Sequence, residues 1–146
     1  FLNEFAAHLV LTACTLAKTR DVFLVRPIPE LGFNVPKTLS RRMIIGIDDD
    51  LYIARTEYLK RNQWVWDAQD RASAACGAQI IDPTRLLCRQ DRCFGSIDQV
   101  PLYSDDDHLG TAGNRMIAPL FQPVFATRSP TRPPEAQHVR LSGPRQ

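Results

Sequence analysis

An aspartate and a histidine three positions apart are the residues of this sequence best suited to general acid–base chemistry. They are Asp105 and His108, in the stretch PLYSDDDHLG at residues 101–110. A histidine base needs a carboxylate on its second ring nitrogen, which fixes the tautomer and stabilises the imidazolium. We expect Asp105 to fold back to the ring of His108, the adjacent Asp107 to diverge, and Asp106 to face solvent or cap the turn. The competing interpretation is a solvated acidic turn that happens to contain a histidine.

Hydrophobic periodicity predicts the elements that position this turn. In chain order they are a helix over 1–17, a buried strand over 22–29, a helix over about 56–76 capped by Thr56, a short strand over 78–82, and a helix over 111–125 that Pro119 bends or divides. The connections at 30–53 and 84–108 show no firm periodicity, and we expect them to be irregular. Two strands joined by a helix predict parallel pairing. Two strands are too few for an independent doubly wound sheet, so we expect the N-terminal part of the domain to lie outside this sequence.

Composition excludes several classes of protein. The 146 residues are 44% hydrophobic and 23% charged, and 18 basic against 16 acidic residues give a formal net charge of +2, so nothing indicates a nucleic-acid partner. No run approaches the roughly 18 apolar residues of a membrane span. The Asp48–Asp50 stretch lacks the alternating ligands of a calcium loop and is interpreted as a solvated acidic turn. We expect no metal and no cofactor. Residues 1–126 are predicted to form the domain, and the proline- and arginine-rich residues 127–146 a disordered tail.

The four cysteines leave two interpretations open. Cys88 and Cys93 lie five apart in a predicted loop, and no second pair has the spacing of a zinc site. They are either free thiols or a disulfide, which in this short loop would contribute about 2 kcal/mol and imply an oxidising compartment. Cys14 and Cys76 fall on predicted helices, and we interpret them as small buried residues rather than reactive thiols.

Three stretches together resemble a known family. LYSDDDHLGTAGNRMIAPLF resembles the final sequence block of SGNH-type hydrolases, and more closely that of the SGNH domain fused to bacterial membrane O-acyltransferases. That block has a tyrosine followed by Asp-x-x-His-Leu-Ser. VFLVRPIPELGFNVP resembles the next-to-last strand of the same domain, and IDPTRLLCRQDRCF its cysteine pair before the catalytic loop. The matches occur in the family's order and cover roughly residues 1–126. Gly110 replaces the usual serine, which we expect to affect the start of the helix rather than the chemistry.

The resemblance implies a three-layer α/β/α fold with a flavodoxin-like parallel sheet, of which this chain is the C-terminal portion. It makes Asp105 and His108 the acid and base of a Ser-His-Asp triad, and it favours a Cys88–Cys93 disulfide. It also implies an N-terminal membrane acyltransferase domain, a location at the periplasmic face of the bacterial inner membrane, and a glycan or lipopolysaccharide-type acyl acceptor. The portion in hand is expected to be soluble by itself.

The nucleophile of such a triad is missing from this sequence. The family's serine belongs to a Gly-Asp-Ser motif, which does not occur here, and Ser96 is interpreted as a turn residue. A base without a nucleophile cannot transfer an acyl group, so we expect this chain alone to be inactive. The first hypothesis is therefore a part of an O-acyltransferase or esterase acting on acyl, in the first instance acetyl, esters of cell-surface glycans. The second is a truncated, non-catalytic remnant that binds a glycan or a partner, and the third is a cytosolic structural domain.

Overall fold

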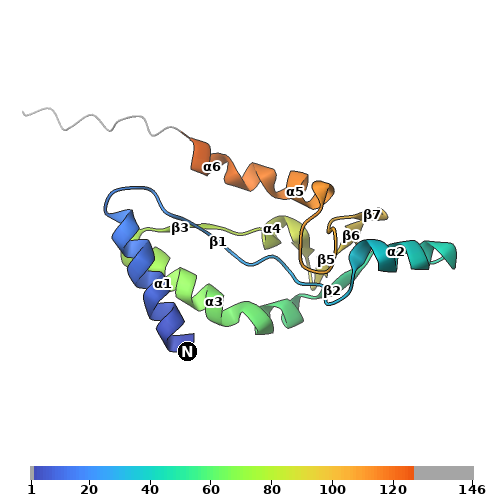
Figure 1. Ribbon diagram of the computed structural model, residues 1–146, viewed down its shortest axis with the longest axis horizontal. Coiled ribbons are helices and arrows are strands. Elements are labelled where there is room, and N and C mark those ends of the chain that lie inside the picture. Colours follow the sequence, from blue (N-terminus) through green and yellow to red (C-terminus); the bar gives the residue numbers. More distant parts are fainter. Residues whose placement is uncertain (1, 127–146) are drawn as a thin grey trace, which may run out of the picture.

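The computed structural model describes residues 2–126 and consists of short strands between helices (Figure 1). The predicted tail at 127–146 lies outside the described residues. In chain order the elements are α1 (Leu2–Ala17), β1 (Phe23–Val25), α2 (Val35–Ile44), β2 (Tyr52–Ala54), α3 (Arg55–Cys76), β3 (Gln79–Ile81), α4 (Thr84–Leu87), β4 (Cys88–Arg89), β5 (Arg92–Phe94), β6 (Ser96–Ile97), β7 (Val100–Pro101), α5 (Thr111–Ile117), the 3-10 helix η1 (Ala118–Phe121) and α6 (Gln122–Phe125).

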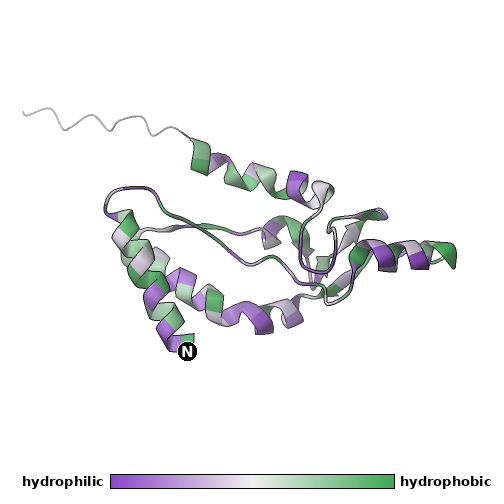
Figure 2. Ribbon diagram, viewed as in Figure 1, coloured by the Kyte–Doolittle hydropathy of each residue, from purple (hydrophilic) through white to green (hydrophobic). Residues whose placement is uncertain are grey.

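Strands β1 and β3 form a parallel pair connected through α3, as the alternation of elements predicts. Phe23 lies opposite Gln79, and Val25 lies opposite Ile81. In the view of Figure 1, α1 and α3 lie on one side of this strand pair and α5 to α6 on the other. Helix α1 is the more hydrophobic of the two helices on its side (Figure 2). The described part of the chain thus shows helices around a two-stranded parallel sheet.

The first strand differs from its prediction. The assigned strand ends at Val25, and only the N–H of Arg26 continues the pairing, donating to the carbonyl of Ile81 at 2.9 Å. Burial on both faces was also expected, yet Val25 is 43% exposed. Among the residues described, β1 pairs only with β3, so its other edge carries no neighbouring strand.

The connection over 30–53 is not irregular, because it contains α2 and β2. Helix α2 has its own start signal: the side chain of Asn34 accepts a hydrogen bond from the backbone N–H of Lys37 at 3.0 Å, and Pro36 occupies the first turn. The expected cap of α3 is wrong, since this helix begins at Arg55 and has no side-chain cap. Its end at Gly77, which has a φ of 72°, agrees with the prediction.

The connection over 84–108 is also more ordered than expected. It holds α4 and four strands of two or three residues each. Strands β4 and β5 form a hairpin that β2 extends into a three-stranded antiparallel sheet, and β6 and β7 form a second hairpin. Such short strands display too few residues for hydrophobic alternation to be recognised in the sequence. At the C-terminal end, η1 divides the last helix at Pro119, as predicted.

Two disulfides cross-link the chain. Cys88 and Cys93 pair across the β4–β5 hairpin, with Cα atoms 4.0 Å apart. Cys14 and Cys76 are not the isolated buried residues we expected, because they form a second disulfide between α1 and the end of α3, 62 residues apart. Each helix is visible in the sequence, but which faces of two distant helices meet is decided by their packing.

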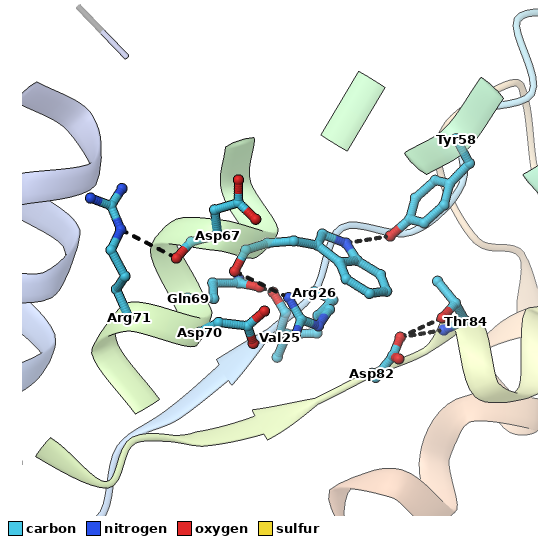
Figure 3. Close-up of polar contacts among 10 residues, drawn as sticks. Val25, Arg26, Tyr58, Asp67, Gln69, Asp70, Arg71, Asp82 and Thr84 are labelled. Carbon is cyan, nitrogen blue, oxygen red and sulfur yellow. Dashed lines mark hydrogen bonds and ion pairs between the residues drawn. The ribbon is translucent and has the colours of Figure 1, made fainter. Parts of the chain in front are cut away.

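The C-terminal end of β1 is joined to α3 by a network of polar contacts (Figure 3). The guanidinium of Arg26 lies 3.9 Å from the centre of the Trp66 ring and forms an ion pair with Asp70. The Tyr58 hydroxyl donates to the Pro27 carbonyl at 2.7 Å and accepts from the Trp66 indole N–H at 3.1 Å. These contacts, together with the hydrogen bond from the Gln69 side-chain amide to the Val25 carbonyl at 2.9 Å, fix β1 against α3, although the side-chain oxygen of Gln69 is buried without a partner in the described chain.

The main hydrophobic core draws its residues from α2, α5 and the segments before and between them, and Ile53 packs against both this core and the cluster that contains Tyr58. The buried residues of the main core are Leu31, Val35, Leu39, Leu51, Leu87, Leu102, Tyr103 and Ile117. Leu102 and Tyr103 directly precede the Asp105–His108 turn. The turn thus rests on the core through the residues that lead into it.

Candidate functional site

Asp105 and His108 come together as the sequence predicts. The Oδ2 atom of Asp105 lies 3.0 Å from Nδ1 of His108. The prediction for Asp107 is wrong, because its Oδ1 atom lies 2.8 Å from the same ring nitrogen. The turn is tight enough for carboxylates one and three residues before the histidine to reach one side of the ring. His108 itself is exposed, with 74% of its side chain accessible.

The carboxylate of Asp105 is oriented by the backbone of its own turn. Its Oδ1 atom accepts hydrogen bonds from the backbone N–H of His108 at 2.7 Å and of Asp107 at 3.1 Å. This leaves Oδ2 for the imidazole. An aspartate that closes a turn onto its following amides in this way has little rotational freedom.

Electrostatics reinforces the pair. The hydrogen bonds from the backbone N–H groups of His108 and Asp107 lower the pKa of Asp105 below its ordinary value. The hydrogen bond that Nδ1 of His108 donates to the Asp105 carboxylate, followed by the negative charges of Asp105 and Asp107, raises the pKa of His108. Asp105 is therefore ionised at neutral pH and favours the protonated imidazole, which is the state that a histidine base reaches after taking a proton.

Main-chain contacts hold the turn in place. The carbonyl of Asp105 accepts from the N–H of Val35 at 2.9 Å, and the carbonyl of Asp106 accepts from the N–H of Leu31 at 2.8 Å. The side chain of Asp106 is exposed, as predicted. The segment that enters α2 therefore supports the turn from outside, a role that no side-chain pattern indicates.

Helix α5 packs closely behind the turn. Gly110 precedes it as the N-cap and offers no side-chain cap, which agrees with the expectation that this residue affects the start of the helix. Gly113 is required by the packing, because a Cβ atom there would lie 2.3 Å from the carbonyl oxygen of Leu102. No candidate role was expected for Gly113, although a glycine inside a predicted helix is itself a signal of close approach.

Ser96 is not a free turn residue. Its buried hydroxyl accepts from the N–H of Leu51 at 2.8 Å and donates to Asp50 at 3.1 Å. Asp50 also accepts from the N–H groups of Asp98 and Gln99, so it is a structural group rather than part of a solvated acidic turn. Both side chains serve the β6–β7 hairpin and are not available as nucleophiles.

Ligand-type atoms of Asp105, Asp107 and His108 lie within 4.8 Å of one another. Exposed carboxylates at this spacing are common without a metal. Since both carboxylates approach the same ring nitrogen, we interpret the set as an imidazole with its carboxylate partners.

These features define the class of the protein, which is an α/β domain with an exposed Asp–His pair beside its last helix. Residues 2–123 match the family described as the SGNH domain fused to AT3 domains, and the chain belongs to this family. No curated protein and no solved structure matches the chain.

Membership in this family indicates a function of the acyltransferase or esterase type, and a membrane acyltransferase domain as the partner to which such domains are fused. Within residues 2–126, no helix combines the length and the apolar character needed to cross a membrane.

Proposed function

We propose that this chain supplies the aspartate and the histidine of a Ser-His-Asp triad in an SGNH-type O-acyltransferase or esterase. One observation carries the proposal: Asp105 contacts Nδ1 of His108, and no described residue hydrogen-bonds to Nε2. In such triads the carboxylate holds Nδ1, and Nε2 takes the proton from serine. The serine comes from a segment outside this sequence, because the 146 residues contain no Gly-Asp-Ser motif.

The residues divide the work as follows. Asp105 fixes the tautomer with the proton on Nδ1 and stabilises the imidazolium. His108 removes the proton from the serine hydroxyl through Nε2, the serine oxygen attacks the carbonyl carbon of the acyl ester, and the ester C–O bond breaks as the imidazolium gives its proton to the leaving alcohol. His108 then takes a proton from the acceptor hydroxyl or from water, whose oxygen displaces the acyl group from the serine, and the proton returns to the serine oxygen. The charge of Asp107 adds to the stabilisation of the imidazolium.

The substrate that we propose is an O-acyl, in the first instance acetyl, ester of a cell-surface glycan at the periplasmic face of the inner membrane. The two disulfides support this location, because disulfides persist in oxidising compartments. The complete domain is proposed to be a three-layer α/β/α sandwich in which further parallel strands pair with the free edge of β1.

Reconstitution tests the proposal. Residues 1–146 are co-expressed with an N-terminal SGNH fragment that carries Gly-Asp-Ser, and hydrolysis of a chromogenic acetyl ester is measured. We expect activity only when both fragments are present, and we expect His108→Ala to abolish it. Asp105→Asn, which leaves the wrong tautomer, should lower the rate by a factor on the order of 10⁴. Asp106→Asn makes the same charge change in the same turn and should leave the rate unchanged.

Activity that survives His108→Ala would refute the assignment of the base. A complex that assembles without activity would instead favour the alternative function, a non-catalytic module that binds a glycan or a partner chain.

A further inference from the structure

The C-terminal end of α2 exposes three consecutive apolar side chains. Met43 is 49% exposed, Ile44 84% and Ile45 70%, and we call these three residues the α2 tip. In Figure 1, α2 extends away from the neighbouring strands, and Figure 2 shows that its end is hydrophobic. Single exposed apolar residues are ordinary, whereas apolar residues that gather on one exposed surface mark an interaction site.

The outer face of α2 carries positive charge directly behind this tip. Val35 and Leu39 bury the inner face of the helix in the main core. Lys37 and Arg41 lie four residues apart and are exposed, and Ile44 continues the same face of the helix. Helix α2 contains no acidic residue. Its free surface therefore has a basic stretch that ends in an apolar one.

The backbone at the end of α2 is suited to apolar surroundings. The carbonyl of Arg42 accepts from the N–H of Ile45 at 3.1 Å and from the N–H of Ile47 at 2.9 Å. The carbonyl of Met43 accepts from the N–H of Gly46 at 3.1 Å. Carbonyl groups at a helix end are costly to remove from water unless they have such partners. The α2 tip can thus leave water without leaving these two carbonyls unpaired.

The spacing of cations and apolar side chains along α2 fits a phospholipid surface. A rise of about 1.5 Å per residue places Arg41 about 5 Å and Lys37 about 10 Å behind Ile44 along the helix axis. Helices at a bilayer surface bury their apolar side chains about 5–10 Å into the boundary between headgroups and acyl chains. Insertion of the tip therefore brings both cations to the depth of the lipid phosphates.

The acidic residues that follow the tip limit the share of charge in this contact. Asp50 is directed away from it, because its carboxylate accepts from the buried hydroxyl of Ser96. Asp48 and Asp49 are exposed, and Asp49 lines the same cavity as Arg42. These two carboxylates offset part of the basic charge. We therefore expect apolar insertion to supply most of the affinity, and Lys37 and Arg41 to add a smaller preference for anionic lipid.

We propose that the α2 tip inserts into the surface of a phospholipid bilayer. The family to which the chain belongs is fused to membrane acyltransferase domains, and such a fusion brings the tip close to a bilayer. At the other end of the same helix, the N–H of Val35 holds the carbonyl of Asp105 at 2.9 Å. Helix α2 has 10 residues and is about 15 Å long, so it sets the distance between the membrane surface and the Asp105–His108 turn.

Binding is tested on the full chain by co-sedimentation with vesicles of phosphatidylethanolamine and phosphatidylglycerol. We expect the chain to bind at millimolar lipid. Ile44→Ser combined with Ile45→Ser should weaken this binding at least tenfold, because two side chains then no longer enter the bilayer. Circular dichroism should show an unchanged fold, since both side chains are exposed. Leu11→Ser is the matched control, because it changes a side chain on α1 that is 64% exposed, and it should leave binding unchanged.

The part played by charge is tested with a second pair of variants. Lys37→Gln combined with Arg41→Gln should weaken binding to the anionic vesicles at least fivefold and leave the weaker binding to phosphatidylcholine vesicles unchanged. Lys18→Gln combined with Arg20→Gln makes the same charge change at the end of α1 and should have no comparable effect. An equal loss in the two double variants would show attraction by net charge alone and would overturn docking through α2.

The remaining outcomes separate membrane docking from the proposed function. No binding to the anionic vesicles, binding unchanged by the double serine variant, or an equal loss in Leu11→Ser would each overturn the docking surface. The vesicles contain no protein, so a tip that serves only a protein partner would give the first of these results. His108→Ala should bind vesicles like the wild-type chain. A failure of ester hydrolysis therefore leaves vesicle binding intact, and a failure of vesicle binding leaves the assignment of Asp105 and His108 intact.

Discussion

Two ion pairs show how differently the two halves of this molecule are built. Arg26 and Asp70 join β1 to α3, and the Arg26 side chain is only 9% exposed and lies against Trp66. His108 and Asp105 lie in an exposed turn that is closed by its own backbone. The buried Arg26 has long-range partners in Asp70, the Trp66 ring and the Trp66 carbonyl, while Asp70 itself is 58% exposed. The contact between β1 and α3 is thus stabilised by a buried cation with several partners, whereas the Asp105–His108 turn leaves Nε2 of the imidazole without a partner among the described residues.

The two disulfides give the largest expected contrast. The Cys14–Cys76 bond closes a loop of 62 residues, and its replacement by two alanines should lower the free energy of unfolding by about 4 kcal/mol. The Cys88–Cys93 bond closes a loop of 5, so its double alanine variant should lose only about 2 kcal/mol. Urea unfolding under non-reducing conditions measures both. An equal loss in the two variants would contradict the view that the α1–α3 bond is the main covalent constraint.

A smaller difference in stability is expected between a buried and an exposed arginine, each of which forms an ion pair. Arg26→Met keeps the apolar stem but removes the contacts with Asp70 and Trp66, and should cost about 2–3 kcal/mol. Arg61→Met removes an exposed pair with Glu30, in which the arginine side chain is 61% accessible, and should cost about 0–1 kcal/mol. Thermal and urea unfolding decide between them. If the exposed arginine cost as much as the buried one, burial would not be the source of the stabilisation.

Two buried tyrosines provide a smaller contrast. Tyr58→Phe leaves the Pro27 carbonyl and the Trp66 indole N–H without a partner, which should cost about 1–2 kcal/mol. The hydroxyl of Tyr103 is buried without a hydrogen-bond partner in the described chain, so Tyr103→Phe should be neutral or slightly stabilising. Burial also raises the pKa of Tyr103 above its ordinary value, so this hydroxyl does not ionise near neutral pH. A destabilised Tyr103→Phe variant would show that its hydroxyl has a partner in solution.

The smallest effect on stability is expected from pH at the exposed pair. The raised pKa of His108 means that its contribution is complete below the unfolded value of 6.5 and is lost as the pH rises through the folded value. The lowered pKa of Asp105 means that its contribution is present above 3.8 and is lost as the pH falls through its folded value. The activity of the reconstituted enzyme should instead rise with pH as His108 loses its proton, because only the neutral imidazole can act as the base. A rate that falls as the pH rises through the pKa of His108 would contradict a histidine base.

Particular residues show what the sequence predicts and where it stops. The spacing of Asp105 and His108 is local, so their contact was predictable, as was the parallel pairing of two strands around a helix. The approach of Asp107 to the His108 ring was not predictable, because it depends on how neighbouring side chains rotate within one turn. The Cys14–Cys76 bond and the partner of Arg26 depend on how distant helices and strands pack. The strands β4 to β7 are too short to show a period, while the Asn34–Pro36 signal of α2 was present and overlooked.

The most direct test of the central claim is an NMR titration of the His108 ring in the 146-residue chain. Asp105 is expected to be the principal partner of the imidazole and Asp107 a secondary one. The pKa of His108 should therefore lie above its ordinary value in the wild-type chain, fall most in Asp105→Asn, and fall less in Asp107→Asn. A pKa of His108 that is the same in the wild-type chain and in Asp105→Asn, or one that responds only to Asp107→Asn, would contradict the account.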